Sequence, residues 1–281
     1  MRLSEESNES FGFYYPDRSV FIFRLLTSAG FSRGKIRKWI GKKWVSKGYK
    51  VVDATVRGIN YRLHITRNTT DQKILTSSKF YDKEEILHLA KGLDPETLGY
   101  KGEQTTFIDV GANTGYYALS LAYLGYSKVI AIEPNPPTLE MLRFNVGCNN
   151  VGENITIVPV CIGDGNNVDF YTSAGLGTAS VIKENHGSKP ITVPSMPLLD
   201  IIKNNNIKSI QGLKIDVEGF EDKALMPFFE SAQKSLWPRY IVIEDCHAED
   251  WDVDIIAYLK KIGYVAEGST RGNQLLHLHD C

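Results

Sequence analysis

The segment "TTFIDVGANTGYYALSLAYLG", residues 105–125, decides the fold class. A short apolar run ends at Asp109 and enters a loop that contains Gly111 and Gly115, and a segment with helical periodicity follows. Glycines in such a loop allow positive φ angles and let a ligand approach the backbone closely. This order predicts a strand, a ligand-binding loop and a helix of an α/β sheet.

Strand and helix patterns alternate outward from this segment to the C-terminus. Further core strands are expected in "KVIAIEP" (128–134), "ITIVPVCIG" (155–163), "GLKIDVEG" (212–219) and "RYIVIEDC" (239–246). Such alternation predicts a Rossmann-like, mostly parallel sheet covered by helices on both faces. The last two strand patterns, 264–269 and 274–279, follow each other directly, so the C-terminal strand should be antiparallel. Extra strands are expected in 168–173 and 191–196.

The chain divides into three parts. Residues 1–50 form a basic and aromatic arm, residues 51–104 a hairpin and a lead-in helix, and residues 105–281 the Rossmann-like domain. The hairpin should turn at Arg57-Gly58. Asp82 and Glu85 are placed to form a capping box at the start of the lead-in helix.

Composition indicates a soluble globular protein. The chain has 281 residues, 42% of them hydrophobic, and a formal net charge of −1. No apolar run approaches the roughly 18–20 residues that span a bilayer, and the acidic N-terminal flank argues against a secretory signal. Four scattered cysteines show no C-x-x-C or zinc-finger spacing. We therefore expect a cytoplasmic protein without a cysteine-based metal site.

The glycine loop differs from a dinucleotide-binding loop. The G-x-G-x-x-G fingerprint would need glycines at 111, 113 and 116, but Asn113 and Tyr116 occupy two of these positions. An acid ahead of the loop disfavours a pyrophosphate and suits a ligand that is cationic near the loop. S-adenosylmethionine meets this requirement, since it carries an ammonium and a sulfonium group and no phosphate.

The expected cofactor contacts follow from these positions. Asp109 should hold the methionyl end, directly or through water, and Glu133 should accept the ribose hydroxyls. Asp164 is placed to reach the adenine amino group, or else is an ordinary turn aspartate. The full predicted cofactor set is Asp109, Gly111, Ala112, Asn113, Gly115, Glu133, Asn135 and Asp164.

Asn135-Pro136-Pro137 resembles a tripeptide with which amino-group methyltransferases hold a planar nitrogen. That motif follows the fourth core strand and ends in an aromatic residue, whereas here the tripeptide follows the second strand and Thr138 comes next. We interpret the prolines as the start of a helix, where a missing N–H has no cost.

The motifs together resemble the FkbM family of S-adenosylmethionine-dependent methyltransferases. The resemblance rests on "FIDVGANTGYYALSLA", "IEPNPPTLEMLRFN", "GTASV", "LLDII", "LKIDVEGFE" and "IVIE", and covers roughly residue 81 to the C-terminus. It implies a class I methyltransferase fold and O-methylation of a hydroxyl, commonly on a sugar of a glycan or glycolipid or on a natural-product scaffold. Residues 1–50 lie outside these motifs.

Ionisable residues gather where the fourth and fifth core strands end. These residues are Asp216, Glu218, Glu244, Asp245 and His247. Methyl transfer to a hydroxyl needs alignment and removal of a proton. One carboxylate or the histidine could be the general base, two carboxylates could instead hold a divalent cation, or the acids could be structural. The predicted catalytic set is Asp216, Glu218, Glu244 and His247, without a metal.

Two further segments could shape the site. The glycine-rich tip at 173–180, with Thr178 and Ser180, could wall the active site. Residues 31–50 contain eight Lys or Arg and no acid, with Trp39 and Trp44 at helical spacing. This stretch could contact an anionic membrane at the inner face, bind an acidic acceptor, mediate dimer contacts, or pack as an amphipathic helix.

Three other function classes remain open at this point. One is an N-methyltransferase or nucleic-acid methyltransferase, although no RNA-reading motif is present and no nucleic-acid partner is expected. A nicotinamide oxidoreductase is disfavoured by the missing glycines. A binding module without turnover would have kept the fold but lost catalysis.

Overall fold

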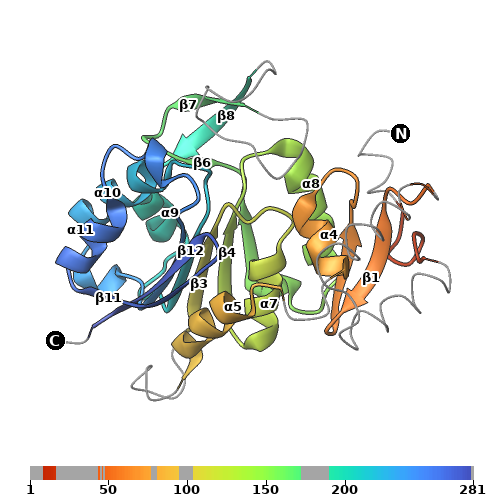
Figure 1. The fold of residues 1–281 in the computed structure, drawn as a ribbon, viewed down its shortest axis with the longest axis horizontal. Helices are drawn as coiled ribbons and strands as arrows, with labels where there is room; N and C mark the ends of the chain where they lie inside the picture. Colours follow the sequence, from red (N-terminus) through yellow and green to blue (C-terminus); the bar gives the residue numbers. More distant parts are fainter. Residues whose placement is uncertain are drawn as a thin grey trace.

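A computed structural model describes residues 9–16, 44, 46, 48–76, 81–94, 104–171 and 190–279. Within them a seven-stranded sheet has the order β11-β12-β10-β9-β3-β4-β5 (Figure 1). The strands are β3 (Thr106–Val110), β4 (Lys128–Ile132), β5 (Ile155–Val158), β9 (Gly212–Ile215), β10 (Tyr240–Glu244), β11 (Tyr264–Thr270) and β12 (Asn273–Leu278). Strands β5, β4, β3, β9 and β10 are parallel, and β12 is antiparallel to β10. The predicted fold class is confirmed.

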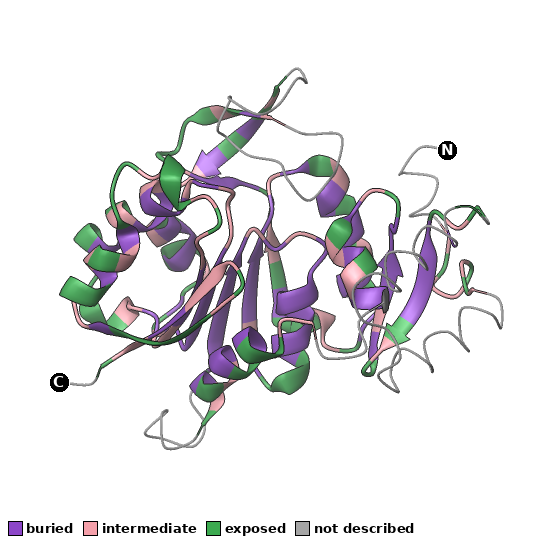
Figure 2. Cartoon of the chain, in the orientation of Figure 1, coloured by how far each residue is buried: buried purple, intermediate pink, exposed green. Residues whose placement is uncertain are grey.

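Helices cover both faces of the sheet. The helices α5 (Lys83–Ala90), α7 (Tyr116–Leu124) and α8 (Pro136–Gly147) pack into one core cluster. The helices α9 (Leu198–Asn204), α10 (Glu221–Ser231) and α11 (Ile255–Lys261) pack into the other. Successive side chains of a strand point to opposite faces. Phe107 therefore belongs to the first cluster and Ile108 to the second. Figure 2 shows the buried central strands between partly exposed helices.

A smaller sheet lies beside the main one. It has the order β6-β8-β7, with β6 (Cys161–Ile162), β7 (Asn167–Phe170) and β8 (Ile191–Met196). Strands β7 and β8 confirm the extra strands predicted between the third and fourth core strands. The predicted third core strand, 155–163, is instead divided between β5 of the main sheet and β6 of the smaller one. Residues 172–189, which include the predicted site-walling tip, lie outside the described residues.

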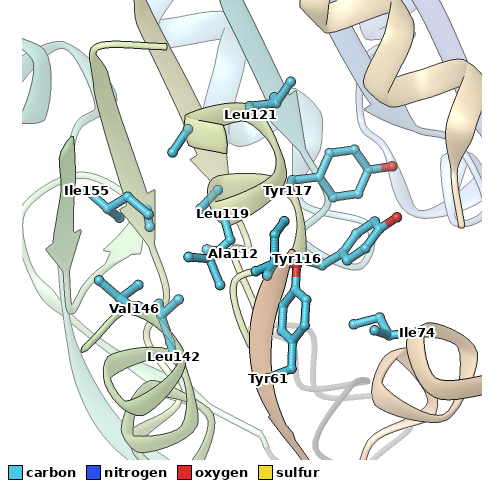
Figure 3. Packing of buried hydrophobic residues seen from close by; sticks show 14 of the residues in the cluster. Tyr61, Ile74, Ala112, Tyr116, Tyr117, Leu119, Leu121, Leu142, Val146 and Ile155 are labelled. Atoms are coloured by element: carbon cyan, nitrogen blue, oxygen red, sulfur yellow. The ribbon is translucent and has the colours of Figure 1, made fainter. Parts of the chain in front are cut away.

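The N-terminal hairpin joins the core of the main sheet. Strands β1 (Val52–Val56) and β2 (Ile59–Leu63) pair antiparallel, and Arg57 and Gly58 both have positive φ at the turn, as predicted. The helix α4 (Thr69–Thr76) follows. Figure 3 shows Tyr61 of β2 and Ile74 of α4 beside Tyr116 of α7. The hairpin and α4 therefore pack directly against the helix that follows the glycine loop.

The capping box predicted at the start of α5 is wrong. The side chain of Asp82 forms no helix cap, because this residue has φ 48 and its carboxylate accepts a hydrogen bond from the Tyr117 hydroxyl. Glu85 instead accepts hydrogen bonds from Thr270 and Asn273. Trp44 is only 5% exposed and packs in the core cluster that also contains the hairpin and α7. Trp39 lies outside the described residues.

The edge strand β11 contains a bulge. Ala266 pairs with Leu276 and Gly268 pairs with Leu275, so Glu267 has no residue opposite it. The Glu267 carboxylate contacts Lys91 and the imidazole of His88. No helix in the described part of the chain has the length and apolar character to cross a membrane.

Candidate methyl-transfer site

A cavity of about 670 Å³ lies outside the carboxyl ends of β3, β4, β9 and β10. In open α/β sheets, ligands bind at this edge because the loops there leave a crevice. The wall on the glycine-loop side consists of Gly111, Ala112, Asn113, Ile132, Glu133, Pro134, Val160, Cys161 and Ile162. The opposite wall includes Tyr81, Asp82, Tyr117, Lys214, Asp216, Glu218, Phe220, Glu244 and Arg271.

Gly111 fixes the shape of the loop. It has φ 79, and a Cβ atom built there would lie 1.9 Å from the backbone oxygen of Asp216. No other residue fits this close approach between the end of β3 and the end of β9. Asn113 has φ 50 and Gly115 has φ 92, so the chain takes left-handed backbone at three positions before α7 begins. The predicted loop residues Gly111, Ala112 and Asn113 line the cavity, whereas Gly115 faces Leu142.

Four amide groups of the loop already donate hydrogen bonds within the protein. Gly111 and Ala112 donate to the carbonyl of Ile132, Asn113 donates to the Glu133 carboxylate, and Gly115 donates to Ala112. A pyrophosphate needs free N–H groups at this place. The described loop amides therefore do not form the phosphate cradle of a dinucleotide-binding protein.

Asp109 has contacts different from those expected from the sequence. Its side chain is 1% exposed, is absent from the cavity wall and accepts a hydrogen bond from the backbone N–H of Ala118 at 3.0 Å. Burial raises the pKa of Asp109 to about 6, and the attraction of Lys214 opposes this rise. The carboxylate thus supports the first turn of α7 from beneath the loop, and the geometry gives no direct contact with a methionyl ammonium in the cavity.

Glu133 lies at the end of β4 and reaches the cavity. Its two oxygens accept the N–H groups of Asn113 and Asn135, each at 2.9 Å, and burial raises its pKa to about 7 despite these bonds. Each carboxylate oxygen has a second lone pair, which leaves it able to accept a ribose hydroxyl. Asn135 begins α8 with Pro136 in the first helical turn, as expected, but its buried side chain does not line the cavity.

The predicted adenine contact of Asp164 finds no support. Its carboxylate is exposed and accepts both the backbone and the side-chain N–H of Asn166, which is ordinary turn geometry. It lies outside the main cavity. The cavity wall after β5 is instead apolar, with Val160 and Ile162, and can pack against a planar base.

The ends of β9 and β10 place three carboxylates and one lysine in the cavity. Lys214 is buried and contacts Asp216 at 2.9 Å. Burial would lower the pKa of Lys214, but attraction by Asp216, Asp109 and Glu244 outweighs this effect and raises it. Asp216 is therefore held by a buried cation.

Glu218 and Glu244 are the other two carboxyl groups of this wall. Burial, then repulsion from Asp216, raises the pKa of Glu218 to about 7 and that of Glu244 to about 8. The Oε2 atom of Glu244 is buried and has no hydrogen-bond partner among the described residues. A carboxyl group with a pKa near neutrality is suited to exchange protons at physiological pH.

His247 contacts Glu218 from outside the cavity. Its Nε2 atom lies 3.1 Å from Glu218 Oε2, and its side chain is 39% exposed. Glu218 has φ 55, a left-handed conformation that is unfavourable for a residue with a side chain. The structure thus brings the predicted catalytic residues Asp216, Glu218 and Glu244 to one wall, with His247 between Glu218 and solvent.

Residues 109–266, more than half of the chain, match the model of the methyltransferase FkbM domain. The chain belongs to the FkbM methyltransferase family. It is a class I methyltransferase whose cofactor is S-adenosylmethionine. A search of the curated proteins finds no match to the sequence.

Several solved methyltransferase structures are similar to the chain. Human methyltransferase 10 domain containing protein shares 16% identity, with coverage of 78% of this chain and 86% of that one and a TM-score of 0.44. A delta-N METTL16 methyltransferase domain shares 12% identity, with 86% and 93% coverage and a TM-score of 0.48. An rRNA methylase from Streptococcus thermophilus shares 14%, with 72% and 98% coverage and a TM-score of 0.42. Similarity at this level does not indicate which acceptor the chain methylates.

The cavity fits the cofactor of the FkbM family. The glycine loop offers a close backbone surface without a phosphate cradle, Glu133 offers acceptors for a ribose, and the apolar wall at Ile162 offers a face for adenine. The Asp245 carboxylate is engaged by Gln274, and no group of three His, Cys, Asp or Glu among the described residues could hold a metal ion.

Sequence reasoning missed the part of the cavity wall that precedes the FkbM domain match. Thr69, Thr70, Lys73, Tyr81 and Asp82 precede the match, and the residues missed within or after it include Tyr116, Tyr117, Arg271 and Asn273. The short polar stretch "TTDQK" has no periodicity that marks it as part of a site. The two tyrosines directly after Gly115 are the one signal that could have been used, because aromatic residues at a loop–helix junction face the ligand crevice.

Proposed function

We propose that the protein methylates a hydroxyl group of a sugar in a glycan or glycolipid, or of a natural-product scaffold. The observation that carries the proposal is the pair of cavity carboxyl groups, Glu218 and Glu244, with pKa values of about 7 and about 8. A hydroxyl acceptor must lose its proton as the new bond forms, so a nearby base of this strength increases the rate.

The proposed base is Glu244, because its Oε2 atom is buried in the cavity wall and has no hydrogen-bond partner within the described part of the chain. S-adenosylmethionine supplies the activated methyl group on its sulfonium. The acceptor oxygen forms the new bond to the methyl carbon while the sulfur–carbon bond breaks, and the hydroxyl proton passes to Glu244. Glu218 lies in the same wall and contacts the partly exposed His247 at 3.1 Å.

The rest of the wall supports a sugar-like acceptor. Asp82 and Asp216 present carboxylate oxygens, which accept hydrogen bonds from hydroxyl groups. Tyr81, Tyr117 and Phe220 present aromatic surface in the same cavity, and such rings pack against the C–H face of a sugar. A site with a few polar groups among aromatic side chains is typical of a small-molecule pocket.

A methyl-transfer assay with mass detection tests the proposal. Free and lipid-linked saccharides, amines and RNA are each incubated with S-adenosylmethionine and the protein. We expect a mass gain of one methylene only in the saccharide pool, removed by Glu244→Gln. Methylation confined to amines or RNA would contradict the proposal, and binding of S-adenosylhomocysteine without any turnover would favour the binding-module alternative.

We also propose that the basic stretch 31–50 brings the protein to an anionic membrane face, which suits a lipid-linked acceptor. The eight Lys or Arg of this stretch support it, although Trp44 is buried in the core. Co-sedimentation with vesicles containing 30% phosphatidylglycerol tests this. We expect Lys42→Glu/Lys43→Glu to reduce sedimentation at low salt, and equal sedimentation of both proteins would refute it.

A further inference from the structure

The glycine loop is held by a segment that precedes the FkbM domain match. The side-chain amide of Asn68 donates to Asn113 Oδ1 at 2.6 Å, and the hydroxyl of Thr114 donates to Asp71 Oδ1 at 2.8 Å. The other oxygen of Asp71 accepts the N–H of His64 at 2.7 Å. These contacts place the first turn of α4 against the loop that lines the cavity.

Packing holds α4 in the same position. Ile74 and Leu75 of α4 are buried in the core cluster that also contains Tyr61 and Tyr116 (Figure 3). The opposite side of the helix faces the cavity, where Thr69, Thr70 and Lys73 form part of the wall. One short helix therefore supports the loop with one set of residues and offers two hydroxyls and an ammonium to the ligand with another.

Lys73 is a cation that attracts the Asp82 carboxylate but lies beyond ion-pair distance of it. Its ammonium donates to the Tyr81 hydroxyl at 3.1 Å and lies 5.0 Å from the centre of that ring. It forms no ion pair with a carboxylate among the described residues, although Asp82 and Asp216 line the same cavity. By contrast, the other lysine of this wall, Lys214, is paired with Asp216.

The amino-acid end of the cofactor carries one ammonium and one carboxylate, and both need partners near the loop. We propose that Thr69, Thr70 and Lys73 form the subsite that binds this carboxylate. The geometry points to it because an ammonium and two hydroxyls enter the cavity beside Asn113. Bonds from such groups to a carboxylate are charge-assisted and therefore among the stronger ones. The proposal depends on the cofactor and is independent of the acceptor.

Two ligands that differ only in the carboxylate test the proposal. Calorimetric titration measures the affinities of the full-length protein for S-adenosylmethionine and for decarboxylated S-adenosylmethionine, which keeps the amine. Lys73→Met should weaken binding of the first ligand about tenfold, the usual effect of losing one charge-assisted bond, and that of the second less than twofold. Lys73→Arg should restore most of the affinity, since it keeps the charge.

Controls keep the test decisive. Lys83→Met makes the same change at an exposed lysine of α5 outside the cavity and should alter neither affinity. Thr70→Val, expected to cause a loss of about threefold for S-adenosylmethionine alone, serves as a second variant if Lys73→Met unfolds. An equal loss for both ligands, or no loss for either, would overturn the subsite. Neither result would affect the proposed hydroxyl acceptor, which the methyl-transfer assay tests separately.

Discussion

The buried ion pair between Arg62 and Asp53 allows the sharpest prediction about stability. Arg62 is 1% exposed and Asp53 is fully buried, and two parallel bonds of 2.8 Å join the guanidinium to the carboxylate. Asp53 also accepts the N–H groups of Gly12 and Tyr14. Asp53→Ala removes this acceptor and leaves a guanidinium in the core without its counter-charge.

The expected cost follows from this burial. Removing one partner of a buried pair typically costs about 3–5 kcal/mol, because the remaining charge stays desolvated. Since domains of this kind have a total free energy of unfolding of roughly 5–15 kcal/mol, the loss is a large fraction of the total. The melting temperature should fall by roughly 10 °C.

Urea unfolding, followed by circular dichroism, measures the effect. Asp200→Ala is the matched control, because Asp200 and Lys203 form an exposed pair at 3.6 Å that should contribute well below about 1 kcal/mol. Asp53→Asn should lie between the wild type and Asp53→Ala, since it keeps one acceptor oxygen. A loss below about 1 kcal/mol for Asp53→Ala would refute the reasoning, because water would then have to solvate the Arg62 guanidinium.

Three further predictions concern the site. Gly111→Ala should abolish binding of S-adenosylhomocysteine in calorimetry, because the new methyl group would overlap the Asp216 carbonyl; unchanged affinity would show that the loop moves freely. Glu244 has a pKa of about 8, so kcat/KM should rise with pH up to about 8 as this carboxyl group ionises. Glu244→Gln should lower kcat/KM at least about 100-fold. A pH profile that is the same in the variant as in the wild type would rule out this base. Burial raises the folded-state pKa of Asp71 to about 7, so its contribution to stability is full below pH ~4 and is lost as pH rises through 7. Asp71→Asn should therefore flatten the decline in stability between pH 5 and 8 in urea unfolding, and an identical decline would contradict the assignment.

Much of the sheet could be predicted from the sequence because its strands are short apolar runs separated by clear helices and turns. The run ending at Asp109 and the run ending at Glu133 marked neighbouring parallel strands, whose carboxyl ends meet at one edge. The same rule brought Asp216 and Glu244 into one cavity wall. The hydrophobic periodicity and the order of the strands were sufficient to predict where these residues lie, because their positions depend only on the path of the backbone.

Side-chain contacts could not be predicted in the same way. The sequence shows that Asp109 ends a strand, but only the packing of α7 shows that its carboxylate accepts the Ala118 amide beneath the loop. Asp82 matches the capping pattern, yet its carboxylate accepts a hydrogen bond from the nearby Tyr117 hydroxyl and does not cap the helix. The contribution of α4 depends on long-range contacts such as the one between Asn68 and Asn113, which are 45 positions apart.

The bulge in β11 bears on how the molecule behaves at high concentration. An exposed edge strand offers unpaired N–H and C=O groups on which another chain can add a strand. The extra residue at Glu267 interrupts this row of groups, and its carboxylate places a charge near the edge, in contact with Lys91. Replacing Glu267 with valine while deleting Gly268 would remove both the bulge and the charge, and we expect this variant to self-associate more readily at the β11 edge.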